Sequence, residues 1–291
     1  MRTVGLCGLG NMGSVIAGRL SKEWPVLGFD LDETRRGAAE REHGVRLVDA
    51  ARDLADADVV VFSLPTPQAS LAVLTELPPG TVVVETSTVN PADMRRGAAT
   101  GARLVDAAIL SGVSQAAAGT APLLVGGAPE DVDAVWPVLT ALSEHIVRCG
   151  ELGSGMAAKV INNAVAHAVM VVLAEAGAMA AATGVSRAEL AGLLGGPDGG
   201  LVRPLTHRFT ERVLRGDYDG GMPTEAARKD STLALALAQD AGVPLFAVQA
   251  AHTVYELGVS EGLARLDYSA IATLWERWTG QALADPQVPS S

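Results

Sequence analysis

The chain has 291 residues, and its composition is that of a folded protein with a net negative charge. Hydrophobic residues make up 48% of the chain and charged residues 19%, which is typical of a globular protein and argues against intrinsic disorder. The formal net charge at pH 7 is −11, and the basic residues form no cluster larger than a doublet. Nucleic acids and anionic membrane surfaces are therefore disfavoured as partners.

The cysteine content and the apolar stretches indicate in which cellular compartment the protein is expected. Cys7 and Cys149 are far apart in sequence, and no Cys/His spacing typical of metal ligands accompanies them, so we expect neither a disulfide framework nor a metal site. The N-terminus has no secretory signal pattern. The most apolar stretch, 164–185, is interrupted by His167 and Glu175, so we expect no membrane span. These features indicate a soluble, reduced, cytoplasmic protein.

Strand and helix patterns alternate through the first half of the chain. Val59–Phe62 is apolar at consecutive positions, which is typical of a parallel strand covered by helices on both faces. The alternation predicts a doubly wound α/β sheet. The predicted strands are Thr3–Cys7, Val26–Asp30, Asp58–Leu64, Thr81–Thr86, Arg103–Ile109, Pro122–Val125 and His145–Arg148, and the helices between them include Ser14–Leu20, Leu31–Glu42, Pro91–Ala99 and Asp131–Leu142.

Strand patterns are missing from the second half. Residues Ser154 to about Thr183 form one helix pattern whose apolar residues cover most of the circumference, so we expect this helix to be buried on nearly all sides. Further helices are predicted at Arg187–Leu194, Leu201–Leu214, Thr224–Ala241, Leu245–Leu257 and Ser269–Trp278. We therefore predict a sheet domain over 1–152, an all-helical domain over 153–281 and a flexible tail over 282–291.

A glycine-rich loop, Gly8-Leu9-Gly10-Asn11-Met12-Gly13, joins the first strand to the first helix. In a dinucleotide-binding loop of this type Gly8 permits the tight turn, Gly10 lets a pyrophosphate approach the backbone, and Gly13 lets the helix pack on the strand. The helix N-terminus offers N–H groups and a partial positive charge to the phosphates. Because a strand precedes the loop, a helix follows it and Asp30 ends the next strand, the sequence predicts a dinucleotide site.

Asp30 bears on the choice of cofactor. A carboxylate at this position can bind the ribose hydroxyls of NAD and repels the 2′-phosphate of NADP. The next residue is Leu31, so no arginine stands beside Asp30 to neutralise a phosphate, although Arg35 or Arg36 could reach one if the turn bends that way. The sequence therefore favours NAD over NADP.

Lys159 and Asn163 lie four residues apart on one face of the long apolar helix. Two successive asparagines cost helix stability, and a buried lysine costs more unless it has a partner. One interpretation is a lysine that packs its stem and keeps its ammonium group in water. We favour a proton donor with an orienting amide, because burial lowers the pKa of a lysine toward the working range.

Several segments occur in an order that resembles the β-hydroxyacid dehydrogenase family, which includes 3-hydroxyisobutyrate dehydrogenase-like enzymes and is related to 6-phosphogluconate dehydrogenase. The segments are the glycine-rich loop, Leu64-Pro65-Thr66, Glu85-Thr86-Ser87-Thr88-Val89-Asn90-Pro91, Gly153-Ser154-Gly155 with Lys159-Val160-Ile161-Asn162-Asn163, and Lys229-Asp230. The resemblance spans about residues 3–280. It implies an N-terminal Rossmann-type domain that binds the dinucleotide and an all-α C-terminal domain for substrate and oligomerisation.

The same resemblance implies an NAD(P)-dependent oxidoreductase that transfers a hydride between nicotinamide and a small β-hydroxyacid or semialdehyde. Lys159 would be the general acid in reduction and the base in oxidation, and Asn163 would orient the substrate. The implied cofactor-binding residues are Gly8, Leu9, Gly10, Asn11, Met12, Gly13, Asp30, Leu64, Pro65, Thr88 and Lys229. The implied substrate-binding residues are Leu110, Ser111, Gly112, Asn163, Met222 and Lys229.

The substrate loop departs from the family pattern. The family usually has Asp-x-Pro-Val-Ser-Gly-Gly, whereas this chain has Asp106-Ala107-Ala108-Ile109-Leu110-Ser111-Gly112, and Met222 stands where many relatives have Phe. Either the loop shifts by one residue so that Ser111 and Gly112 bind a carboxylate, or the substrate is not a simple carboxylate. The departure therefore concerns the substrate and leaves the hydride chemistry unchanged.

Two alternatives stay open at this point. Imine reductases share the architecture but typically have Asp or Tyr where this chain has Lys159, so an imine or ketone reductase with an altered loop is the first alternative. The second is a non-catalytic module that senses the cofactor, although inactive homologues usually lose the lysine. We also expect the apolar helix Ala157–Ala182 to pack against another subunit in a homodimer or homotetramer.

Overall fold

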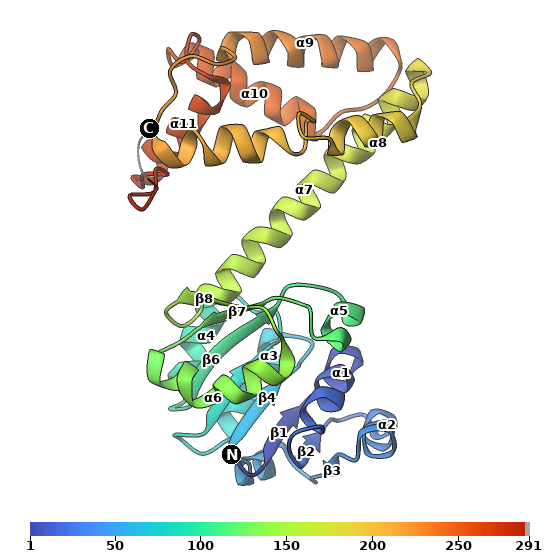
Figure 1. Ribbon diagram of the computed structural model, residues 1–291, viewed down its shortest axis with the longest axis vertical. Helices are drawn as coiled ribbons and strands as arrows, with labels where there is room; N and C mark the ends of the chain where they lie inside the picture. The colour runs from blue at the N-terminus through green and yellow to red at the C-terminus, as the bar shows by residue number, and fades with distance from the viewer. Residues whose placement is uncertain (289–291) are drawn as a thin grey trace. The chain divides into compact units, whose positions relative to one another are not determined.

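The computed structural model describes residues 1–288 and divides the chain into two compact units, Met1–Val165 and Ala166–Ser291 (Figure 1). The division falls inside helix α7 (Ser154–Thr183), whereas the boundary predicted from the sequence lies just before that helix. Residues 289–291 of the predicted tail lie outside the described residues. Each unit is described by itself below.

The first unit is built on an eight-stranded sheet with the order β3-β2-β1-β4-β5-β6-β7-β8. Neighbouring strands are parallel, except that β6 and β7 pair antiparallel. The sequence does not predict β3, because two residues carry no periodicity. The strands are β1 (Val4–Cys7), β2 (Val26–Phe29), β3 (Arg46–Leu47), β4 (Val59–Phe62), β5 (Val82–Glu85), β6 (Arg103–Ile109), β7 (Leu123–Gly126) and β8 (Ile146–Gly150).

Helices cover both faces of the sheet, as the run of apolar residues in β4 predicts (Figure 1). Val59 and Val61 pack into one layer of the core, Val60 and Phe62 pack into the other, and all four are buried. The first layer is completed by α1 (Asn11–Leu20), α2 (Glu33–His43), α5 (Val113–Ala118) and α6 (Pro129–Leu142), and the second by η1 (Ala51–Asp56), α3 (Pro67–Glu76), α4 (Pro91–Ala98) and the start of α7. The doubly wound sheet is therefore confirmed.

The second unit is helical, as expected, but one predicted helix is wrong. The stretch 201–214 is divided between a π-helix and a short 3-10 helix, because Pro204 offers no N–H to a helix arriving from Leu201. The elements are the C-terminal part of α7, α8 (Arg187–Gly195), η2 (Pro204–Thr210), η3 (Val213–Arg215), α9 (Thr224–Asp240), α10 (Ala247–Ser260), η4 (Tyr268–Ile271) and α11 (Ala272–Thr279).

Helix α7 has the predicted bounds, but the prediction that it is buried on nearly all sides is wrong for the single chain. Ile161 is 64% exposed, Val165 59% and Met170 61%. Both clusters of buried hydrophobic residues lie between Val4 and Met156. A pattern that is apolar all round a helix indicates that the helix is covered, but not whether its own chain covers it.

By length and composition alone, α7 is also the one helix among the described residues that could cross a membrane. Its mean hydropathy reaches 1.8 over an 18-residue window, so the interruptions at His167 and Glu175 do not remove this property. The carboxylate of Glu175 is buried, and it accepts hydrogen bonds from the backbone N–H groups of Ala247 and Val248 at the start of α10. Glu175 thus joins α7 to another helix of the second unit.

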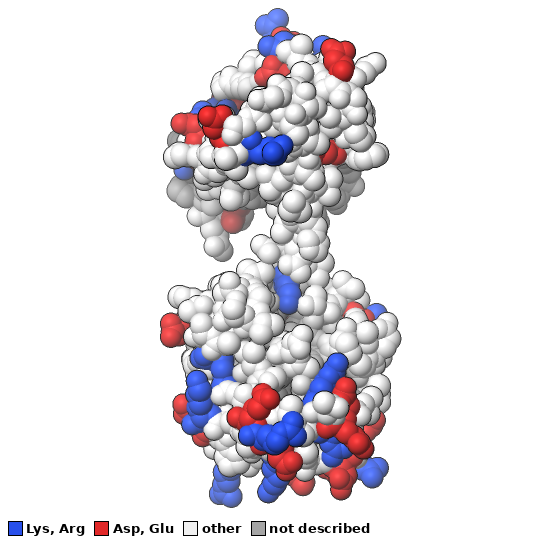
Figure 2. Space-filling view, turned by 90° about the vertical axis from the view of Figure 1, so that its right-hand side faces the viewer, with Lys and Arg blue, Asp and Glu red and all other residues white. Residues whose placement is uncertain are grey.

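Charges of both signs lie side by side on the visible face of the first unit, as Figure 2 shows. The first unit has exposed ion pairs, such as Arg148 with Asp133 at 2.7 Å. Exposed pairs of this kind contribute little to stability because water screens them.

Candidate functional site

The glycine-rich loop turns the chain from β1 into α1 with very little room. Gly8 has a φ of +94°, and a Cβ placed on it would lie 2.2 Å from the carbonyl oxygen of Ser63. A Cβ on Gly13 would lie 2.0 Å from the carbonyl oxygen of Gly8. Both contacts are with backbone, which cannot move aside as a flexible side chain can. They support the packing roles that the sequence predicts for Gly8 and Gly13.

Gly10 is different, because its Cβ position faces open space. The nearest atom to that position is Nη1 of Arg35 at 3.7 Å. Gly10 is the N-cap of α1 and makes no side-chain cap, so the first N–H groups of the helix have no intrahelical partner there. Unpaired N–H groups and the positive end of the helix dipole suit the pyrophosphate of a dinucleotide.

A cavity of about 680 Å³ opens in front of this loop. Eight of the predicted cofactor residues line it, namely Gly8, Gly10, Asn11, Met12, Gly13, Asp30, Leu64 and Pro65. Leu9 does not, because its side chain is buried in the core, although its backbone N–H donates to Asp30. Thr88 is exposed and lies outside the lining, and Lys229 belongs to the second unit. The donors and the open glycine in this cavity fit a dinucleotide.

The lining also includes residues that the sequence does not single out, among them Ser63, Asp32 and Glu76. Ser63 directly follows β4, and the carboxyl end of a parallel strand is a signal that could have identified it. Cys7 lines the cavity too, and burial raises the pKa of its thiol to about 12, so this thiol is neutral and unreactive.

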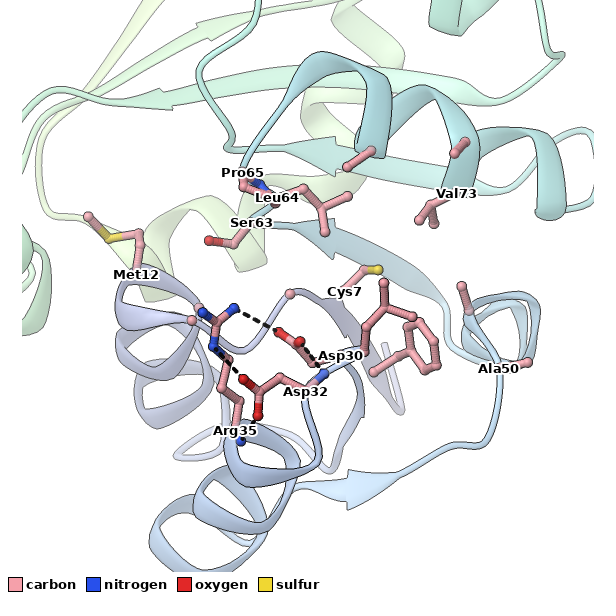
Figure 3. A pocket seen from close by; sticks show the side chains of 18 of the residues that line it. Cys7, Met12, Asp30, Asp32, Arg35, Ala50, Ser63, Leu64, Pro65 and Val73 are labelled. Carbon is pink, nitrogen blue, oxygen red and sulfur yellow. Dashed lines mark hydrogen bonds and ion pairs between the residues drawn. The ribbon is translucent and has the colours of Figure 1, made fainter.

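Two carboxylates and one guanidinium meet at the end of β2 (Figure 3). Asp30 accepts hydrogen bonds from the backbone N–H of Leu9 at 2.7 Å and of Asp32 at 2.9 Å. The guanidinium of Arg35 lies 3.9 Å from Asp30 and 3.6 Å from Asp32. Arg35 therefore reaches the cavity, one of the two possibilities that the sequence leaves open, but it arrives already paired with acids.

A chain of hydrogen bonds holds the opposite wall of the cavity. The backbone N–H of Leu64 donates to Oγ of Ser87 at 2.7 Å, and the backbone N–H of Ser87 donates to Oε1 of Glu85 at 2.8 Å. Glu85 is fully enclosed, and burial raises the pKa of its carboxyl group. The segment that follows β5 thus fixes the position of Leu64 and, through it, of Pro65.

Lys159 lies in the second turn of α7, still in the first unit, and is half-buried. No carboxylate of the described residues lies within 4.0 Å of its ammonium group. Burial lowers the pKa of Lys159 from its usual value of 10.5, in the direction that the sequence predicts. Asn163, one turn further on, is also half-buried, whereas Asn162 is exposed. A desolvated lysine without a counter-ion is suited to proton transfer.

The predicted substrate residues are divided between the two units. Leu110 packs beside the second layer of the core, while Ser111 and Gly112 are exposed between β6 and α5. In the second unit, Met222 is held by its backbone, since its N–H donates to Asp267 and its carbonyl oxygen accepts from Tyr268. Lys229 is exposed and forms an ion pair with Asp230 at 3.2 Å. The substrate roles of these residues stay predictions.

The described residues contain no group of three or more His, Cys, Asp or Glu side chains that could hold a metal ion.

Comparison with protein families shows to which family the chain belongs. Residues 3–150 match the family model for the NAD binding domain of 6-phosphogluconate dehydrogenase. Residues 153–275 match the model described as NAD-binding of NADP-dependent 3-hydroxyisobutyrate dehydrogenase. The chain belongs to the β-hydroxyacid dehydrogenase family. Membership makes it an NAD(P)-dependent oxidoreductase that acts on CH–OH groups.

Individual members of the β-hydroxyacid dehydrogenase family match nearly the whole chain. The 2-(hydroxymethyl)glutarate dehydrogenase of Eubacterium barkeri is 29% identical, with 98% of both chains covered. The NAD-dependent L-serine dehydrogenase of Pseudomonas aeruginosa is 30% identical, with 97% of this chain and all of that protein covered. The Mycobacterium tuberculosis 3-hydroxyisobutyrate dehydrogenase, solved with L-serine, is 30% identical with a TM-score of 0.63, covering 94% and 99% of the two chains.

Proposed function

We propose that this β-hydroxyacid dehydrogenase oxidises the primary alcohol of a 2-substituted 3-hydroxypropanoate to the aldehyde, reversibly and with NAD, and that Lys159 moves the proton. The observation that carries the proposal is Lys159 itself, which is half-buried, has a lowered pKa and has no acidic partner among the described residues. An arginine could not replace it, because a guanidinium does not release its proton near neutral pH.

The substrate class follows from chemistry that the relatives share. The names of these relatives, 2-(hydroxymethyl)glutarate, L-serine and 3-hydroxyisobutyrate dehydrogenase, all describe a CH₂OH group on the carbon next to a carboxylate. The three compounds differ only in the other substituent on that carbon. The altered loop at Leu110–Gly112 and the methionine at 222 are the positions at which we expect this chain to differ in its choice of substituent.

In the oxidation, neutral Lys159 accepts the proton of the alcohol at Nζ while the carbon gives up its hydride. A bound nicotinamide would accept the hydride. In the reduction, the protonated Lys159 donates that proton to the carbonyl oxygen. We propose that the amide of Asn163 orients the oxygen toward Nζ, and that Ser111 and Gly112 receive the carboxylate because both are exposed at the end of β6.

The test is nicotinamide absorbance in both directions. NAD and NADP would be offered with 3-hydroxyisobutyrate, L-serine and 2-(hydroxymethyl)glutarate, and NADH and NADPH with the corresponding semialdehydes. Lactate, which lacks the CH₂OH group, is the matched control substrate. Turnover that requires the CH₂OH group and Lys159 supports the proposal. Turnover of imines alone, or cofactor binding with no turnover in the whole matrix, would replace it with one of the two alternatives.

We propose NAD as the preferred cofactor, because two carboxylates and one guanidinium leave the end of β2 with net negative charge. NADH should bind at least about tenfold more tightly than NADPH in a fluorescence titration. Asp32→Asn keeps the side-chain oxygen that caps α2 but removes one charge, so it should narrow the preference by roughly threefold to tenfold. Glu33→Gln, an equal change of charge outside the cavity, should not. Equal binding of NADH and NADPH by the unaltered protein would contradict the prediction.

We further propose that a second copy of the chain covers the exposed apolar side chains of α7, giving a homodimer or a homotetramer. Light scattering without detergent should give at least twice the chain mass of 29.8 kDa. Met170→Glu places a charge on the 61% exposed methionine and should lower that mass, whereas Gln249→Glu, the same charge at an exposed polar position, should not. A monomer, or a protein that requires detergent or lipid, would contradict this proposal.

A further inference from the structure

The start of helix α7 has no cap of its own, although Lys159 lies in the second turn of this helix. Gly153, which directly precedes α7, has a φ of +94° and no side chain. The cap comes from a different element, because Asp106 of β6 reaches across to the helix. Its Oδ1 accepts the N–H of Gly153 at 2.6 Å, and its Oδ2 accepts the N–H of Met156 at 2.8 Å.

The fit between Asp106 and the helix leaves no space for another arrangement. Asp106 is completely buried. A Cβ on Gly155 would lie 2.2 Å from the carbonyl oxygen of Leu124 and 2.7 Å from Oδ2 of Asp106. A Cβ on Gly126 would lie 2.6 Å from Oδ1 of Asp106. The first turn of α7 is therefore pressed against β6 and β7 in one register, with the carboxylate at its centre.

No lysine, arginine or histidine of the described residues lies within 4.0 Å of the Asp106 carboxylate. Burial raises the pKa of this carboxyl group, while the N–H donors of Gly153 and Met156 act in the opposite direction. Compensation for burying the charge thus comes from the helix start, whose free N–H groups and dipole favour an anion. The carboxylate and the helix start depend on each other.

Strand β6 has a second role in the site, since it leads directly into Leu110–Gly112. One side chain of that strand thus ties the predicted substrate loop to the helix that carries the proton donor. Enzymatic proton and hydride transfer depend on such spacings, and displacement by about 1 Å costs about 10²-fold in rate.

We propose that Asp106 is the positioning residue for Lys159. By capping α7 from β6, it holds the lysine at a fixed distance from the substrate loop and keeps its ammonium group partly shielded from water. The proposal rests on the proposed function of Lys159 and adds a residue to which the sequence resemblance gives no role. A cap with a merely structural function would affect the stability of the protein but not the environment of Lys159.

The chain offers an experiment that does not depend on turnover, because it has only three lysines, Lys22, Lys159 and Lys229. Acylation of the folded protein over a range of pH, read by mass spectrometry, gives the labelling midpoint of Lys159, with the exposed Lys22 and Lys229 as internal references. In Asp106→Asn, the amide offers an N–H where the helix needs an acceptor. The helix start should loosen, and the midpoint of Lys159 should rise by at least half a pH unit toward its usual range.

Glu175→Gln is the matched control. Glu175 is also a buried carboxylate that accepts backbone N–H groups at a helix start, in this case that of α10. Both variants should lower the melting temperature, but Glu175→Gln should leave the Lys159 midpoint unchanged. Asp106→Ser, which is smaller and keeps one acceptor, carries the test if Asp106→Asn does not fold.

The sign of the shift separates the outcomes. An unchanged midpoint makes Asp106 an ordinary structural cap and overturns the proposal. A lower midpoint means that the carboxylate acts only through its charge, and it overturns the proposal as well. In assays with NADH and a semialdehyde, Asp106→Asn should lower kcat by about 10–100-fold with an unchanged Kd for NADH, and the deuterium isotope effect on hydride transfer should increase. If Lys159→Ala keeps its turnover, the proposed function fails. The shift in the labelling midpoint of Lys159 would still show whether Asp106 positions the start of α7.

Discussion

Replacing Lys159 with alanine lowers turnover by about 10²–10⁴-fold and leaves the dissociation constant of NADH unchanged. The loss is that expected for a general acid, since the variant removes the proton donor and leaves substrate and cofactor in place. NADH binding is spared because Lys159 does not line the cavity in front of the glycine-rich loop. The measurements are steady-state kinetics and a fluorescence titration.

Two further variants serve as controls for the loss of a surface charge and for the loss of side-chain length. Lys22→Ala removes an exposed lysine that lies outside the site, in the segment between α1 and β2, and should leave turnover unchanged. Lys159→Met removes the charge but keeps the length of the side chain. It should be as inactive as Lys159→Ala without lowering the melting temperature, because the half-buried ammonium group is costly to desolvate. Near wild-type turnover in Lys159→Ala would exclude Lys159 as the proton donor.

The proposed role of Lys159 sets the direction of the pH dependence, and its lowered pKa moves the pH range of that dependence downward. Reduction needs the protonated lysine, so its rate should fall as pH rises through a pKa that lies below 10.5, and oxidation, which needs the neutral lysine, should rise over the same range. Because the unfolded chain holds this proton to higher pH than the folded chain does, the folded state also gains stability as pH rises between the two pKa values. Parallel profiles in both directions would contradict the assignment.

Periodicity and local chemistry predict most of the first unit. Four consecutive apolar residues suffice for β4, and the loop between Gly8 and Gly13 is recognisable because its first and last glycines meet a steric requirement that few other loops impose. The direction of the pKa shift of Lys159 also agrees with the sequence, although the helix around it is largely exposed in the single chain. These features depend on residues that are close in sequence.

Features that depend on distant partners are not predictable in this way. Arg35 reaches the cavity only because the turn before α2 bends toward the glycine loop, and Asp106 meets α7 across 47 residues of sequence. A signal for Asp106 was present, because a charged residue flanked on both sides by apolar residues of one strand needs a buried partner. The cover of α7 cannot be predicted from its own pattern, which would be the same whether another helix or another chain supplied it.

Gly13 and Gly10 should respond differently to substitution by alanine. The first substitution should reduce the stability of the protein, and the second should reduce its affinity for NADH. At Gly13, inside α1, the intrinsic helix propensity favours alanine over glycine by about 1 kcal/mol. Even so, Gly13→Ala should destabilise the protein by about 3 kcal/mol or more, because the new Cβ would lie 2.0 Å from the carbonyl oxygen of Gly8 and the helix would have to move off the strand. Thermal or urea unfolding measures this loss.

Gly10→Ala should instead leave the free energy of unfolding within about 0.5 kcal/mol of the unaltered protein. The φ of Gly10 is −69°, which alanine adopts freely, and its Cβ would meet only the flexible end of Arg35 at 3.7 Å. The added methyl group stands where the pyrophosphate has to approach the backbone, so NADH affinity should fall by about 10–100-fold, the equivalent of one or two charge-assisted hydrogen bonds.

If Gly10→Ala binds NADH normally, the dinucleotide does not lie against this loop. If Gly13→Ala is as stable as the unaltered protein, the close packing of α1 on the loop is wrong. The pair thus separates the glycine that serves the fold from the glycine that serves the ligand.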